Sequence, residues 1–174
     1  AESNGAGDYL FAGETKDATL RRALIAFPVA SIPSGSTIQS VSLALYMSRT
    51  RTQDQAVTLH RALADWGEGS SNASGEEGAG APATTGDATW TQRFYPSTPW
   101  ASAGGDFAAS ASASITVGNA TQYYTWTSAG MVADVQAWLD GSASNYGWLV
   151  RSNENTTRVA KRFNSRTNSD ATRR

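Results

Sequence analysis

The sequence contains no cysteine and a single histidine. Without cysteine the fold must hold without disulfides, and because oxidising compartments permit disulfides without requiring them, this absence leaves the location open. His60 lies in "VTLHRAL", out of phase with the apolar residues of its segment, and with no second ligand beside it we interpret it as a structural histidine rather than a zinc ligand or a triad member. No serine lies in a nucleophile-elbow context either. We therefore expect no catalytic residue and no enzyme.

Charged residues are also few, at 17% of the chain with a net charge of −1. This balance argues against attraction of the whole domain to nucleic acid or to an anionic membrane. Only residues 151–174 are basic, with 7 basic and 2 acidic side chains. We interpret them as a solvated edge strand, with a polyanion site as the alternative. Most aromatic residues lie in the acidic part of the chain, so nucleic-acid binding is not expected.

Long apolar runs are absent as well. None approaches the roughly 20 residues that a bilayer-spanning helix needs, and nothing at the start is typical of a signal peptide. We expect no membrane insertion, and if the protein is exported, the sequence is the mature form. Gly, Ala, Ser and Thr are abundant, a composition common in secreted proteins.

The apolar residues predict many short strands in one domain, residues 1–174. In "TIQSVSLALYMS" the apolar Val41, Leu43, Leu45 and Met47 alternate with other residues, a period of two that places one face of a strand on a core. Weaker patterns predict strands at 20–29, 56–63, 89–94, 113–117, 122–126, 146–152 and 158–165. Short strands separated by polar turns favour an all-β sandwich or barrel.

One segment has a helical period instead. In "SAGMVADVQAWLDG" the apolar Met131, Val135 and Trp138 fall on one helical face, Ser128 can cap the start, and Gly141 follows the end. We predict one short helix over about 128–140 that closes one end or covers one flank of the sandwich.

The stretch "DWGEGSSNASGEEGAGAPATTGDATW", residues 65–90, is long and irregular, with no Lys or Arg between Arg61 and Arg93. Structureless loops of more than about 15 residues are uncommon and indicate a binding loop, an ordered Ω-type loop or disorder. Because tryptophans bracket the stretch, we predict an ordered functional loop.

Aromatic residues in and beside this loop are the candidate ligand-binding residues. A sugar packs its C–H face on an aromatic ring, while polar groups bind its hydroxyls. The candidates are Trp66, Trp90, Tyr95 and Trp100. The alternative is that they pack the loop onto the sandwich, because tryptophan is usually well buried.

Carboxylates beside glycines are candidate ligands for calcium, a hard cation that takes oxygen ligands from loops. The candidates are Asp8, Asp65, Glu68, Asp87 and Asp106. The alternative is ordinary turn and cap chemistry.

A glycosidase would need two carboxyl groups held roughly 5 to 9 Å apart, and nothing in this Gly- and Ser-rich stretch fixes such a separation.

The order of several motifs resembles a known family. These are "LRRALIAFPVASIPSGSTIQSVSLALYM", "VTLHRALADWGEG", "GGDFAASASAS", "YTWTSAGMVADVQAWLDGSASNYGWLV" and "AKRFNSR". Together, from Gly5 to Arg166, they resemble the DNRLRE-type domain of secreted bacterial proteins, some of which are classed as carbohydrate-binding modules. The resemblance implies a jelly-roll-like antiparallel β-sandwich, extracellular or at the cell surface, carried by larger proteins and without activity of its own.

Two functional hypotheses follow. The first is a non-catalytic extracellular module that binds polysaccharide or matrix, and the second is a fibre subunit that assembles with copies of itself. In the family that the chain resembles, a further strand usually precedes "ESNGAGDYLFAG", and the "NSR" region leads into a final apolar strand. We therefore expect a sandwich that lacks one or more terminal strands, either because the polypeptide is trimmed or because a neighbouring subunit donates the strand.

Overall fold

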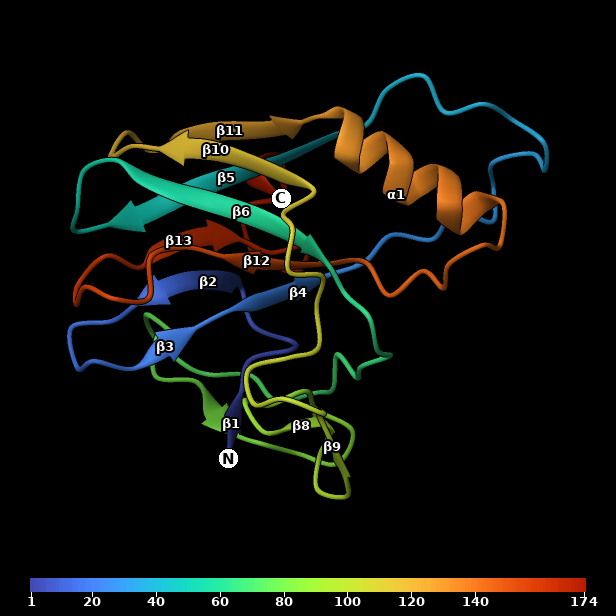
Figure 1. Ribbon diagram of the computed structural model, residues 1–174. Coiled ribbons are helices and arrows are strands. Elements are labelled where there is room, and N and C mark those ends of the chain that lie inside the picture. The colour runs from blue at the N-terminus through green and yellow to red at the C-terminus, as the bar shows by residue number, and fades with distance from the viewer.

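The computed structural model describes all residues from Ala1 to Arg174. Two antiparallel sheets pack against each other, with one helix at one end (Figure 1). The five-stranded sheet has the order β11 (Gln122–Thr127), β5 (Ser42–Thr50), β13 (Lys161–Asn164), β2 (Tyr9–Glu14) and β3 (Leu20–Arg21). The four-stranded sheet has the order β10 (Ala113–Val117), β6 (Gln55–Arg61), β12 (Trp148–Arg151) and β4 (Ala23–Ile25). The predicted all-β sandwich with one helix is confirmed, while the jelly-roll connectivity stays a prediction.

The core lies between the two sheets. In β5 the side chains of Leu43, Leu45 and Met47 are buried while their neighbours are more exposed, as the period-two alternation predicts. Val57 of β6 faces them from the other sheet and is fully buried. Burying each such side chain stabilises the fold by about 1.5–3 kcal/mol. These inward faces hold the sandwich together without disulfides.

The helix α1 (Ala129–Leu139) matches its prediction closely. The Ser128 hydroxyl accepts a 3.0 Å hydrogen bond from the Met131 amide, and Gly141, just past the end, has the positive φ of 70° that favours glycine. Trp138 on its buried face packs against Trp148 of β12, with ring centroids 4.8 Å apart. The helix thus closes one end of the sandwich. No helix in the structure has the length and apolar character that crossing a membrane requires.

Strand β2 was not predicted, because "YLFAGE" lacks a clear alternation. Ala12 and Gly13 are both buried, and at Gly13, with φ 111°, an added Cβ would come within 3.1 Å of the Ala160 backbone. The strand expected at 20–29 is instead two short strands, β3 and β4, and it ends at Ile25, before Pro28. Here tertiary packing and proline set the boundaries rather than local periodicity.

Two small ribbons complete the fold at the end of the molecule away from the helix (Figure 1). β1 (Glu2–Ser3) pairs with β7 (Ala81–Pro82), and β8 (Gln92–Phe94) pairs with β9 (Thr98–Pro99). The first ribbon ties the beginning of the chain to the long irregular segment. In the second ribbon, β8 covers only Gln92–Phe94, the end of the strand predicted at 89–94.

Part of one edge of β5 has no partner. β11 pairs with β5 along Ser42–Met47, whereas β13 pairs only with the stretch from Met47 to Thr50. β13 ends at Asn164, and the next residue, Ser165, donates its amide to the Asp8 carbonyl at 2.9 Å instead. The side of Ser42–Tyr46 that faces away from β11 is consequently paired with no strand.

Candidate functional site

A groove of about 940 Å³ lies between the strands β2–β4 and the irregular segment that follows β6. Three of the four predicted aromatic residues line it: Trp66, Trp90 and Trp100. Phe27 and Arg21 line it from the sandwich side. We call it the tryptophan groove. Tyr95, the fourth predicted residue, is half-buried and does not line it.

Trp66 and Trp100 are fixed by hydrogen bonds to backbone carbonyls. The Trp66 indole Nε1 donates to the Tyr146 carbonyl at 2.8 Å, and the Trp100 Nε1 donates to the Thr89 carbonyl at 2.9 Å. Trp100 is 6% exposed, whereas Trp66 is half-buried. Trp100 therefore packs the segment onto itself and contributes only a small part of the groove surface.

Trp90 is exposed, and its orientation is fixed from one side. Its side chain is 38% exposed, and the Arg22 guanidinium lies 4.7 Å from the ring centroid, a cation–π arrangement. Arg22 is itself held by Glu154, with nitrogen–oxygen distances of 2.6 and 2.7 Å. At Gly104, with φ 91°, an added Cβ would come within 3.0 Å of the Trp90 ring. The indole is thus presented to the groove from a rigid support.

The ion pair beneath Trp90 is largely buried. Glu154 is 6% exposed and lies close to both Arg22 and Arg151. Burial raises the pKa of the Glu154 carboxyl, but hydrogen bonds and attraction from the two arginines outweigh it, so the pKa lies below its ordinary value. Glu154 is therefore charged at neutral pH and keeps Arg22 in place.

Asp87 holds the irregular segment in shape. Its side chain is fully buried, its Oδ1 accepts the Ser70 amide at 2.8 Å, and its Oδ2 accepts the Thr84 amide at 2.7 Å. Burial raises the pKa of Asp87, but these N–H donors and those of Ser71 outweigh it, so the pKa is lowered. At Gly69, with φ 72°, any Cβ would overlap the Asp87 carboxylate. Asp87 thus closes the loop from Ser70 to Thr84.

Glu77 ties the same segment to the beginning of the chain. It is 8% exposed, and its carboxylate accepts the Asn4 side-chain amide at 2.8 Å and the Tyr9 and Asp8 backbone amides at 3.0 and 3.2 Å. Glu77 adopts a positive φ of 60°, which its three hydrogen bonds maintain.

Counter-charges for the acidic loop come from distant parts of the chain. The exposed Glu68 pairs with Arg166 at 2.7 Å, and Glu76 pairs with Arg49 and Arg162. Hydrogen bonding to Arg49, together with the charge of Arg162, holds the pKa of Glu76 below its ordinary value. Sequence order alone, which shows no basic residue near these carboxylates, does not reveal this compensation.

The predicted calcium ligands do not meet at one place. Asp8, Asp65 and Asp106 each accept at least one backbone N–H, at 3.3, 2.9 and 2.9 Å respectively. The other two, Glu68 and Asp87, are bound as described above, and no three His, Cys, Asp or Glu residues form a group that could hold a metal ion. The alternative turn and cap chemistry describes these contacts, and calcium binding stays a prediction.

Sequence reasoning missed Phe27 and the arginines of the groove. Phe27 is 47% exposed and lies just before Pro28, and an aromatic residue at a proline-terminated strand end was the available signal.

His60 has both ring nitrogens within hydrogen-bond distance of protein oxygens, Ala108 O at 2.8 Å and Thr58 Oγ1 at 3.0 Å. Such a histidine fits a structural role.

The chain matches no protein-family model and no curated protein. Membership of the DNRLRE-type family stays a prediction. The resemblance to DNRLRE-type domains rests on the order of the sequence motifs, and the function must be argued from the geometry of the tryptophan groove.

Proposed function

We propose that this chain is a non-catalytic module, extracellular or at the cell surface, that binds polysaccharide or carbohydrate-rich matrix along the tryptophan groove. The observation that carries the proposal is Trp90, whose indole is 38% exposed beside the groove while Arg22 fixes it from one side. A rigid aromatic surface loses little conformational entropy on binding and offers an apolar face to the C–H groups of a sugar ring.

Polar groups along the groove suit hydroxyls and charged substituents of a sugar. Thr91 and Arg21 line it, and the Arg21 guanidinium donates to backbone carbonyls at 2.9 and 3.0 Å and has no carboxylate partner. Its positive charge is therefore free to attract an anionic sugar. The groove volume of about 940 Å³ lies at the upper end of the range for small-ligand sites and leaves room for a short oligosaccharide.

The extracellular part of the proposal is supported by composition. Only 17% of the residues are charged, and Gly, Ala, Ser and Thr are abundant. The resemblance of the motifs to domains of secreted bacterial proteins points the same way.

Affinity electrophoresis in gels that contain neutral or acidic polysaccharides tests the proposal. The wild-type chain should be retarded by at least one of them, and Trp90→Ala should lose most of the retardation without losing its fold. Tyr123→Ala is the matched control, because Tyr123 is 45% exposed but does not line the groove. Trp100→Ala would be a poor probe, since the truncation of a buried tryptophan costs about 3–5 kcal/mol of stability.

Two results would contradict the proposal. One is that no polysaccharide retards the wild-type chain. The other is that Trp90→Ala and Tyr123→Ala migrate like the wild type in a gel that does retard it, which would place binding elsewhere.

A further inference from the structure

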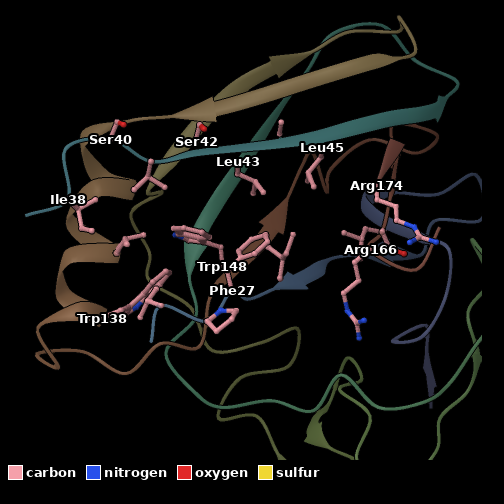
Figure 2. A pocket seen from close by; sticks show the side chains of 18 of the residues that line it. Phe27, Ile38, Ser40, Ser42, Leu43, Leu45, Trp138, Trp148, Arg166 and Arg174 are labelled. Carbon is pink, nitrogen blue, oxygen red and sulfur yellow. The ribbon is translucent and has the colours of Figure 1, made fainter. Parts of the chain in front are cut away.

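A second groove, of about 660 Å³, lies beside β5 between the sandwich and α1. Figure 2 shows Leu43 and Leu45 of β5 pointing into it, with Trp138 and Trp148 on the opposite side. Its lining is mostly apolar. We call it the β5 groove. It shares Phe27 and Arg166 with the tryptophan groove but differs from it in character, since it continues the hydrophobic core to the surface.

The β5 groove runs along backbone that has no partner. The side of Ser42–Tyr46 that faces away from β11 is paired with no strand, because β13 reaches only as far as Met47. Unpaired N–H and C=O groups on an edge are a template for another strand. An apolar small molecule or a lipid chain could fill the hollow, but it could not satisfy this row of polar groups.

Two residues that line the same groove each have a buried side-chain atom without a hydrogen-bond partner. The two atoms are the Trp138 indole Nε1, which can only donate, and the Asn164 Oδ1, which accepts. Both residues are at least nine-tenths buried, at 6% and 5% exposed. Buried polar atoms are nearly always paired in folded proteins. One atom lacks an acceptor and the other lacks a donor, and a peptide backbone carries both kinds of group.

The charges at the groove further restrict what fits. Its only charged lining residues are Arg166 and Arg174, which lie together at one end in Figure 2, and no Asp or Glu lines it. Arg166 is already paired with Glu68, whereas Arg174 has no carboxylate side-chain partner. An occupant with a carboxylate at that end would be favoured over a neutral one.

The strands of a second copy are not free to fill the groove. The strands with alternating apolar residues, β5, β6 and β10, are paired within their own sheets, and β1 is paired with β7. We propose that the β5 groove accepts, in trans, one extended strand of a different polypeptide, with apolar side chains at alternate positions and an acidic residue at the arginine end. This strand would pair with Ser42–Tyr46 and complete the five-stranded sheet.

Hydrogen exchange with a synthetic peptide tests the proposal. The probe is a peptide of about eight residues in which Val and Thr alternate and which ends in Asp. Its addition should slow exchange at alternate amides within Ser42–Tyr46 and at the Trp138 indole N–H. A peptide of the same composition in which the Val residues are contiguous serves as the control and should bind about tenfold more weakly.

Variants of the chain provide the second arm. Val41→Asp adds a charge to a half-buried position in the groove and should weaken peptide binding about tenfold, while Ser114→Asp on the exposed strand β10 should not change it. If Val41→Asp does not fold, the exchange pattern of the wild type with the peptide still decides the question.

Several outcomes would overturn the proposal. Unchanged exchange at Ser42–Tyr46, protection at β4 or β10 instead, or equal binding of both peptides would show that no strand is accepted here. If a longer natural polypeptide that contains this chain already protects these amides without any partner, the strand is supplied in cis and the proposal is wrong as stated.

Discussion

The Asn4 side chain donates a 2.8 Å hydrogen bond to the Glu77 carboxylate, although 73 residues separate them in the sequence. The contact joins the beginning of the chain to the middle of the irregular segment. Together with the backbone amides of Asp8 and Tyr9, it gives Glu77 three donors. The segment that forms one side of the tryptophan groove is thus fixed by a buried carboxylate in addition to the short β1–β7 ribbon.

Glu77→Ala should destabilise the fold by about 1–3 kcal/mol, because it leaves three partly buried donors without their acceptor. The free energy of unfolding in urea measures this loss. Glu76→Ala is the control, since the exposed Glu76 makes surface ion pairs that contribute about 0–1 kcal/mol. Equal losses for the two variants would show that Glu77 has no special role.

Asp87 should protect the long segment from proteases. The wild-type chain should resist cleavage between Gly69 and Gly86, whereas Asp87→Ala, which leaves the Ser70 and Thr84 amides without their acceptor, should be cut there first. Limited proteolysis followed by mass spectrometry of the fragments checks this. Rapid cleavage of the wild-type segment would mean that it is a flexible linker.

The same carboxylate predicts sensitivity to acid. Because the pKa of Asp87 is lower in the folded state than its ordinary value of 3.8, its contribution to stability is complete above that value and is lost as the pH falls through the folded pKa. The free energy of unfolding should fall below about pH 4, and Asp87→Asn should remove part of that fall. Identical pH profiles for the two proteins would contradict the lowered pKa.

Lys161 predicts a second pH dependence of the same sign, at alkaline pH. Its side chain is fully buried, and its Nζ donates to the carbonyls of Gln53 and Gly118, both at 2.7 Å. Burial lowers its pKa from 10.5 to about 8, and the Asp54 charge opposes this only in part. Between these values the unfolded chain holds more protons than the folded one, so the contribution of Lys161 to the free energy of unfolding rises with pH.

Comparison with Lys161→Met isolates this contribution, because the other titrating groups are common to both proteins. The free energy of unfolding of the wild type, minus that of the variant, should increase between about pH 8 and 10.5. Parallel curves would show that the Lys161 pKa is not lowered.

Calcium binding, which the sequence predicts, is checked by thermal unfolding with and without a chelator. A bound ion stabilises the folded state by mass action, so chelation should lower the midpoint if the carboxylates hold calcium. An unchanged midpoint would remove the calcium prediction and leave protein donors, such as those of Asp87, to offset the negative charge.

The sequence predicted the elements whose periodicity is local. The alternation through Leu43 and Met47 predicted β5, and the spacing of Met131 and Trp138 with the Ser128 cap predicted α1. Strand β2 was missed because its buried residues do not alternate, since packing on both sides overrides the period.

For the candidate site, the sequence predicted the right class of residue but not its environment. Trp90 and Trp100 are equivalent in the sequence, yet one is exposed and the other buried. The partners that decide this, such as Arg22 beneath Trp90 and Asn4 beside Glu77, lie far away in the chain and leave no local pattern. Spacing shows which side chains share an element, and it does not show which loops meet in space.

The indole N–H signals of the six tryptophans test the central claim most directly, because each reports on one place in the fold. In a heteronuclear NMR titration with a polysaccharide that retards the chain, the signals of Trp66 and Trp90 in the tryptophan groove should shift. Those of Trp126 and Trp148, whose Nε1 atoms donate to Val57 O and Asp134 Oδ2, should not. Shifts confined to tryptophans outside the groove would contradict polysaccharide binding there.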